Sequence, residues 1–370
     1  MRQEFYKNLD IDLKIIINKL NINKILLVHD IALQYLPACD FFKSLNIQQI
    51  PFADFLPNPL YEDVCKGVFE YNSKQCDSIV AIGGGSAIDV AKCIKLFCKM
   101  DGNNNYLRQE FTDSGVPLIA IPTTAGTGSE STRYAVIYYE GKKQSITHES
   151  IIPDYVVLDP EMLRTLPLYQ KKCTMLDALC QGIESWWSVN STDESKAYSK
   201  TAVTEIIAHM DAYLTNPDDM EAAGHIMSAS NYAGRAINIT QTTAPHAMSY
   251  KLTSMYHIPH GHAVAVCLPR VWRYMLAHIE NTSDARGAEY LKATFMDISK
   301  CMGFAEPEGA VSWFEELLVR LEVAAPKGNE EDALILAESV NPVRLKNNPV
   351  RIDEEDFLPL YKEIIMGEKQ

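Results

Sequence analysis

The chain has 370 residues, of which 47% are hydrophobic and 22% charged, and its formal net charge is −14. This length favours two domains, and the composition is that of an ordinary globular protein. The acidic balance argues against a nucleic-acid-binding protein, which normally shows a basic face. Because the nine cysteines form no C-x-x-C pair and no long apolar run occurs, we expect a cytoplasmic protein with reduced thiols and no membrane span.

The first 160 residues alternate strand-like and helix-like segments. Short apolar runs predict four buried strands, at 24–29, 78–82, 117–121 and 155–160. Helical patterns lie between them, at 60–73 and 86–98. Such an alternation indicates a mainly parallel sheet covered by helices on both faces. The segment 135–147 has two strand-like halves around Glu140-Gly141, which predicts a β-hairpin.

The pattern changes near residue 161, where apolar residues begin to recur at i, i+3 and i+4. This spacing continues towards the end of the chain and predicts a helical second half. We therefore expect an α/β domain at 1–160 and an all-helical domain at 161–370.

Two loops of the α/β half have the composition of a ligand site. Gly83, Gly84, Gly85 and Ser86 lie between a predicted strand and a predicted helix, where backbone N–H groups and the helix N-terminus can bind a pyrophosphate. The spacing is not G-x-G-x-x-G, and a tight turn that binds nothing is the alternative. The segment 121–132 supplies hydroxyls and glycines at the end of the next strand, where ligands of open α/β sheets collect.

Four of the nine histidines fall within positions 246–262. His246 and His260 can converge only if the chain bends between them, and Pro259 with Gly261 supplies that bend. Asp177 lies in another helical pattern and, if buried, needs a cation or a metal as partner. From spacing alone, a metal site and a set of structural histidines remain equally open.

At these residues the chain resembles the iron-containing, or group III, alcohol dehydrogenases, from about residue 20 to 360. The motifs that carry the resemblance are "AIGGGSAID", "IPTTAGTGSE", "LDALCQGIES" and "HAMSYKLTSMYHIPHGHAVAVCLP". The resemblance implies an N-terminal dinucleotide-binding domain and an all-helical metal domain, with the active site in the cleft. It also implies an NAD(P)-dependent alcohol dehydrogenase that acts as a homodimer.

The resemblance assigns roles residue by residue. The expected cofactor-binding residues are Gly83, Gly84, Gly85, Ser86, Asp89, Thr123, Thr124, Thr127 and Lys143. The expected ligands of a divalent metal, Fe²⁺, Zn²⁺ or another ion, are Asp177, His246, His260 and Gln181. Gln181 departs from the family, which usually has a histidine four residues after the aspartate. An amide oxygen is a harder ligand than imidazole and favours oxygen-loving ions.

Part of the histidine stretch, with Tyr250 where the family often has histidine, resembles one branch, the phosphonoacetaldehyde reductases. This implies reduction of phosphonoacetaldehyde to 2-hydroxyethylphosphonate. We expect Arg133, Tyr250 and Lys251 to contact the substrate, because a phosphonate needs cations or donors. Arg270 and Arg273 are further candidates for binding the phosphonate. For each of these arginines, and for Lys251, the alternative is a surface charge or an ion pair.

His262 and His257 are the predicted proton-relay groups, and support of the metal ligands is the alternative. Asp30 follows the first strand, where a carboxylate can bind the ribose and repel a 2′-phosphate, so NAD(H) should be preferred over NADP(H). Capping of the following helix is the other explanation for Asp30.

Three other functions remain open. One is a short-chain alcohol or diol dehydrogenase of the same family. Another is a non-redox lyase similar to dehydroquinate synthase, and the last is a metal-poor NAD-binding protein without catalysis, which the glutamine at position 181 suggests. In each case the expected partner is a small molecule, with neither nucleic acid nor membrane involved.

Overall fold

The computed structural model describes residues 3–367, which form two compact units. One unit comprises Met1–Pro167 with Thr215–Gly234, and the other comprises Leu168–Leu214 with Arg235–Gln370. The first unit holds a six-stranded parallel sheet, and the second is helical. The predicted fold class, an α/β domain followed by an all-helical domain, is therefore confirmed.

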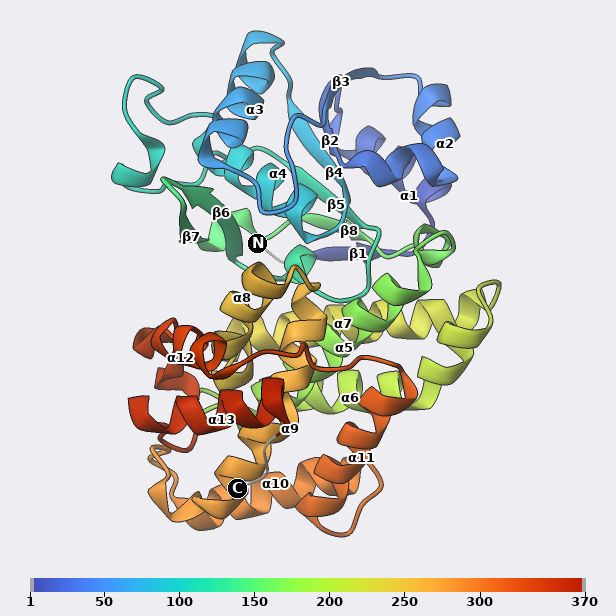
Figure 1. Cartoon of the computed structure of the whole chain (residues 1–370). Helices are drawn as coiled ribbons and strands as arrows, with labels where there is room; N and C mark the ends of the chain where they lie inside the picture. The colour runs from blue at the N-terminus through green and yellow to red at the C-terminus, as the bar shows by residue number, and fades with distance from the viewer. Residues whose placement is uncertain (1–2, 368–370) are drawn as a thin grey trace. The chain divides into compact units, whose positions relative to one another are not determined.

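The sheet has the strand order β1-β8-β5-β4-β2-β3, and every neighbouring pair is parallel (Figure 1). The strands are β1 Glu4–Tyr6, β2 Lys24–His29, β3 Gln48–Phe52, β4 Ser78–Gly83, β5 Leu118–Pro122 and β8 Tyr155–Val157. The helices that accompany them are α1 Leu9–Leu20, α2 Ala38–Ser44, α3 Tyr61–Ser73 and α4 Gly85–Phe97. Because all strands run in one direction, the carboxyl ends of β2, β4 and β5 meet at one edge.

Successive residues of the central strands are buried on opposite faces. Leu26 and Ile79 belong to a core that also contains side chains of α3 and α4. Their chain neighbours Ile25 and Val80 point to the other face and are also fully buried. Burial on both faces explains why these strands are continuous apolar runs in the sequence.

The predicted hairpin is confirmed, with β6 at Tyr134–Tyr139 and β7 at Lys142–Thr147. Glu140 and Gly141 both have positive φ, 51° and 71°, as a type I′ turn requires. The predicted last strand is shorter than expected, because Asp159 caps a 3₁₀ turn that begins at Pro160. The edge strand β3 was not predicted, since its sequence QQIPF is polar at two positions and contains proline.

Every regular element described after Pro167 is helical. The α-helices are α5 Leu168–Trp187, α6 Asp193–Thr215, α7 Met220–Thr240, α8 Ala244–Tyr256, α9 His260–Ala277, α10 Ala288–Cys301, α11 Pro307–Arg320, α12 Glu330–Glu338 and α13 Glu354–Met366. Trp187 is buried against Trp272 at a centroid distance of 5.3 Å, so it packs the core of this unit. Among residues 3–367, none of the helices has the length and apolar character that crossing a membrane requires.

The loop after β5 is fixed in the α/β unit by a contact between two backbones. Gly128 has φ +61°, and a Cβ built on it would lie 2.4 Å from the Cα of Gly234 on α7. Neither glycine can carry a side chain without moving the loop or the helix. The position of the loop therefore depends on two glycines that lie more than a hundred residues apart in the sequence.

Gly128→Ala should lower the free energy of unfolding by about 1–3 kcal/mol. The added Cβ would strain the left-handed backbone at this position and would collide with Gly234. Gly141→Ala is the matched control, since Gly141 has a similar φ of +71° but nothing within 4 Å of the added Cβ. Urea unfolding followed by circular dichroism compares the two. Equal losses would show that the backbone contact adds nothing beyond the strain.

Candidate active site

The two predicted cofactor loops lie side by side at the carboxyl ends of β4 and β5. The backbone N–H of Thr123 donates to the carbonyl of Gly83 at 3.0 Å. A Cβ on Gly85 would lie 3.0 Å from the Thr127 side chain, and one on Gly84 would lie 3.6 Å from that of Thr124. Helix α4 begins at Gly85 with Gly84 as its N-cap. The first backbone N–H groups of this helix have no partner within the helix, so they are available to bind an anion beside the two loops.

Asp30 contacts the glycine-rich turn and also caps a helix. Its Oδ1 accepts a hydrogen bond from Ala32 N at 2.9 Å, and its Oδ2 accepts one from Gly84 N at 3.2 Å. Capping of the following 3₁₀ helix is thus part of its role. A contact with the ribose remains a prediction, which the position of Asp30 beside Gly84 favours.

The second loop is attached to helix α4 by a buried polar network. Asp89 accepts hydrogen bonds from the Ser129 hydroxyl at 2.5 Å and from Val136 N at 2.9 Å. Lys92 donates to Ser129 Oγ and to the carbonyls of Thr132 and Tyr134 at 2.8–3.1 Å. Asp89 therefore uses its oxygens on protein donors, and its predicted contact with the cofactor stays a prediction.

Lys92 has a part in this site that the sequence reasoning missed. Burial lowers the pKa of Lys92 to about 8, against the attraction of Asp89. Burial raises the pKa of Asp89, and the positive charge of Lys143 on β7 is among the contacts that lower it. The signal available in the sequence was the i, i+3 spacing of Asp89 and Lys92 on one helix face.

Three predicted metal ligands converge in the helical unit. Asp177 comes from the middle of α5, His246 from the first turn of α8 and His260 from the first residue of α9. Their ligand atoms lie within 4.8 Å of one another, and Asp177 and His246 are buried. The predicted bend lies between α8 and α9, where His257 is left-handed and Pro259 is the N-cap of α9, and it brings the two histidines to a centroid distance of 5.3 Å. Gly261, which was expected to take part in the bend, is already helical.

Gly261 allows α9 to approach α5. A Cβ at this position would lie 2.0 Å from the carbonyl oxygen of Cys173 and 2.8 Å from Cβ of Asp177. Only glycine fits such a contact. Gly261 therefore brings His260, a predicted ligand, next to Asp177, the predicted ligand on α5.

His246 lies between two carboxylates. Its Nε2 is 3.3 Å from Oδ1 of Asp177, and its Nδ1 is 2.5 Å from Oε1 of Glu184. Burial alone would lower the pKa of His246, but Glu184 and Asp177 raise it to about 9. Glu184 lies in the motif LDALCQGIES, two helical turns after Asp177, and its role was not predicted from the sequence.

The donor set fits a divalent cation. Oδ1 of Asp177 is buried, and among the residues that the structure describes only Nε2 of His246, at 3.3 Å, lies opposite it. Gln181 is buried one turn after Asp177 on the same helix. Two imidazoles with one carboxylate and one amide oxygen are ligands that Fe²⁺ and Zn²⁺ accept.

The remaining residues of the histidine stretch differ in environment. Tyr250 stacks on His260, with ring centroids 5.6 Å apart and planes at 7°. Lys251 and His257 are exposed, and His257 caps α8 in a left-handed conformation. His262 is buried, with Nδ1 2.7 Å from the hydroxyl of Tyr169 and Nε2 2.8 Å from the carbonyl of Ala324. Because a carbonyl only accepts, Nε2 of His262 carries the proton.

The predicted anion-binding arginines have carboxylate partners. Arg133 pairs with Glu149 at 2.6 Å and also donates to the Tyr134 hydroxyl. Arg270 and Arg273 both pair with Glu315. An ion pair, the alternative considered for Arg133, is therefore present, and a substrate role would require Arg133 to exchange or share this partner.

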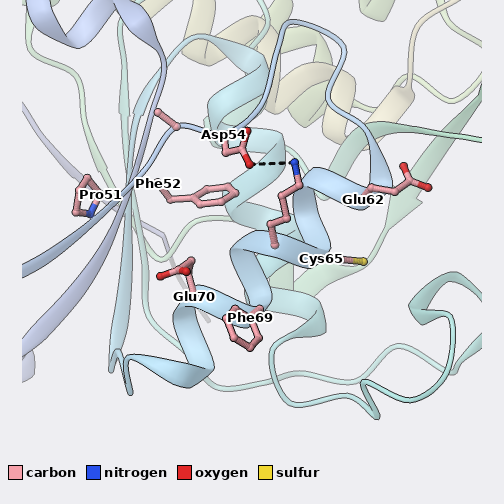
Figure 2. A pocket seen from close by; sticks show the side chains of 9 residues that line it. Pro51, Phe52, Asp54, Glu62, Cys65, Phe69 and Glu70 are labelled. Carbon is pink, nitrogen blue, oxygen red and sulfur yellow. Dashed lines mark ion pairs between the residues drawn. The ribbon is translucent and has the colours of Figure 1, made fainter.

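A pocket at the edge strand β3 is separate from these residues. Figure 2 shows Phe52 and Phe69 lining it, with the ion pair between Lys66 and Asp54, 2.9 Å in length. None of the predicted site residues, all of which lie in the described part of the chain, contributes to this pocket.

Both halves of the chain match models of one protein family. A family model described as iron-containing alcohol dehydrogenase matches residues 11–160, and the C-terminal model of the same family matches residues 172–365. The phosphonoacetaldehyde reductase of Streptomyces viridochromogenes is 33% identical over 76% of this chain and 75% of its own length. The long-chain-alcohol dehydrogenase 1 of Geobacillus thermodenitrificans is 30% identical over 85% of this chain and 82% of its own.

Solved structures are similar over the whole chain. The sulfoacetaldehyde reductase of Bifidobacterium kashiwanohense, solved in complex with NAD⁺, has a TM-score of 0.89 at 25% identity, covering 100% of this chain and 98% of its own. A 1,3-propanediol oxidoreductase has a TM-score of 0.86 at 26% identity, covering 98% and 97%.

The environment of His262 generates a pH prediction. Burial lowers the pKa of His262, opposed by its bond to Ala324. The unfolded chain therefore binds a proton more readily, and this contribution to stability is present above about pH 6.5 and lost as the pH falls. His262→Gln should lower the melting temperature at pH 7.5, and the difference from wild type should narrow by pH 5.5. A difference that is constant across this range in calorimetry would contradict the prediction.

Proposed function

The chain belongs to the iron-containing alcohol dehydrogenase family, and from this premise we propose that it is an NAD(H)-dependent, metal-assisted aldehyde reductase. The observation that carries the proposal is the convergence of Asp177, His246 and His260 within 4.8 Å. These ligands come from three helices, α5, α8 and α9, and the buried Asp177 Oδ1 has no partner in the described chain besides Nε2 of His246. Buried charges of this kind are usually paired or bound to metals.

The two units divide the tasks. Gly83, Gly84, Gly85 and Ser86 would hold the pyrophosphate at the start of α4, and Thr123, Thr124 and Thr127 would line the ribose and nicotinamide. Asp177, His246, His260 and Gln181 would hold the ion. When bound, reduced NAD supplies a hydride and the divalent ion supplies Lewis-acid polarisation of a carbonyl. The assignment of residues 1–160 to the cofactor and 161–370 to the metal belongs to this proposal.

The protein must also orient the aldehyde and deliver a proton. Tyr250 stacks on the ligand His260 and is thereby held beside the ion position, where it can contact the substrate. Reduction of the aldehyde would require a residue of the chain to deliver a proton to the former carbonyl oxygen. His262 has both ring nitrogens engaged by the protein, whereas His257 is exposed. His257 is therefore the better relay of the two predicted histidines.

The proposed substrate is phosphonoacetaldehyde, with 2-hydroxyethylphosphonate as product. Two of the similar proteins are named for acetaldehydes that bear an anionic group, a phosphonate in one and a sulfonate in the other. Arg133 and Lys251 are the proposed cations for this group. The long-chain and propanediol relatives support the alternative of an uncharged alcohol or diol. Action as a cytoplasmic homodimer with NAD(H) completes the proposal.

An aldehyde panel tests this function. Protein loaded with Fe²⁺ or Zn²⁺ should oxidise NADH steadily with phosphonoacetaldehyde, and kcat/KM should exceed that for propanal. A charge-assisted contact of about 1.5–3 kcal/mol corresponds to roughly a ten- to hundredfold preference. Preference for propanal would remove the phosphonate assignment and leave a general alcohol dehydrogenase. No turnover of any aldehyde would favour the lyase or the inactive NAD-binding protein.

Variants of the Arg133–Glu149 pair separate an anion site from a structural ion pair. Arg133→Ala should lose about ten- to a hundredfold in kcat/KM for phosphonoacetaldehyde and little for propanal. Glu149→Gln is the matched control, because it breaks the same ion pair but leaves the guanidinium in place, and it should retain activity with phosphonoacetaldehyde. Equal losses in both variants would show that Arg133 acts only through the ion pair.

Asp30→Asn tests cofactor preference without removing the cap. Asparagine caps helices as well as aspartate does, but it lacks the charge that repels a 2′-phosphate. The ratio of kcat/KM for NADH to that for NADPH should fall by about tenfold. An unchanged ratio, with an unchanged melting temperature, would show that Asp30 serves only as a cap and as a partner of Gly84.

A further inference from the structure

Glu184 is a charged residue of the helical unit for which the proposed reaction has no use. Its side chain is fully buried on α5, where a carboxylate must be matched by donors. Oε1 accepts from Nδ1 of His246 at 2.5 Å. Oε2 accepts from the backbone N–H and from the hydroxyl of Thr243, both at 2.8 Å. All three donors lie at the start of α8.

The bond to Nδ1 decides how His246 presents its other nitrogen. An ionised carboxylate only accepts, so Nδ1 carries the proton in this bond. With an ion in place of the proton on Nε2, that nitrogen would offer its lone pair, and it lies 3.3 Å from Oδ1 of Asp177. The ring of His246 is therefore oriented so that Nε2 points towards Oδ1 of Asp177, the carboxylate oxygen that would bind the same ion.

Glu184 also has a second task that could account for its burial. The Thr243 hydroxyl that donates to Glu184 accepts a hydrogen bond from Trp187 Nε1 at 2.9 Å. Thr243 is the N-cap of α8, so the same carboxylate holds the helix start. A test must separate the orientation of His246 from this structural contribution.

We propose that Glu184 is a positioning residue for the metal site, one that orients His246 through Nδ1 so that Nε2 binds the ion. This inference rests on the proposed function, because it requires a metal beside Asp177, His246 and His260. With glutamine in place of the usual fourth histidine, the site has only two imidazole ligands. Correct aiming of each ring then matters more for retention of the ion.

The experiment measures Zn²⁺ affinity of the full chain by competition with a chromogenic chelator, without cofactor or aldehyde. Glu184→Gln should weaken Zn²⁺ binding about 10–100-fold. Glu184→Asp keeps the charge but withdraws it by one methylene, and should give an intermediate affinity. Asp177→Asn, which changes a direct ligand, should weaken binding at least as much as Glu184→Gln.

Thr243→Val is the matched control for structure. It removes the hydroxyl bonds to Glu184 and Trp187 but keeps the bond between Glu184 and His246. It should lower the melting temperature while the Zn²⁺ dissociation constant stays within about twofold of wild type, a far smaller change than loss of a metal-supporting partner gives.

Two results would overturn the inference. One is an unchanged Zn²⁺ affinity in Glu184→Gln while Asp177→Asn loses the ion. The other is equal weakening in Thr243→Val and Glu184→Gln, which would place the effect in the helix start. If Asp177→Asn also binds Zn²⁺ as wild type does, the metal site of the proposed function fails as well.

Discussion

Two carboxylates buried on one helix set the requirements for much of the helical unit. Asp177 and Glu184 lie two turns apart on α5, and a buried carboxylate is stable only beside donors or cations. A single imidazole, that of His246, lies between them and meets part of this need on both sides. The start of α8 meets more of it through Thr243. The same two carboxylates therefore hold the start of α8 against α5 and orient the imidazole of His246.

The α/β unit also contains a buried charge, the positive ammonium group of Lys92. Lys92 is buried beneath the loop that follows β5 and is bound mainly by neutral oxygens, two of them backbone carbonyls. These bonds fix the loop to the same helix whose first residues form the glycine-rich turn. Loops that approach a ligand are usually the mobile parts of a protein. Here the bonds from Lys92 fix the loop after β5 to α4. The hydroxyl and backbone groups of this loop are therefore held in place before any ligand binds.

Strands β2, β4, β5 and β8, the hairpin and the convergence of Asp177 with two histidines could be predicted, because apolar runs, turn residues and motif order are local signals. Strand β1, three residues long, was not predicted. Strand β3 could not be predicted, since its pairing with β2 and not its own composition makes it a strand. Glu184 and Lys92 were missed for a related reason. A charged residue in a helix is normally solvated, and only the fold shows that these two are buried. The partner of Arg133, Glu149, likewise became visible only once β6, β7 and the turn after them were in place.

The contact of Gly261 with the Cys173 carbonyl bears on attempts to re-engineer this centre. A Cβ at position 261 would lie only 2.0 Å from the Cys173 carbonyl oxygen, so no residue other than glycine fits where α9 approaches α5. His246 is restricted by its two carboxylates, and Asp177 by the geometry of the same junction. Gln181, one turn further along α5, is the proposed ligand at which this chain departs from its family. A change in the metal preference of the proposed site is therefore best sought by screening residues at position 181, with the surrounding scaffold left intact.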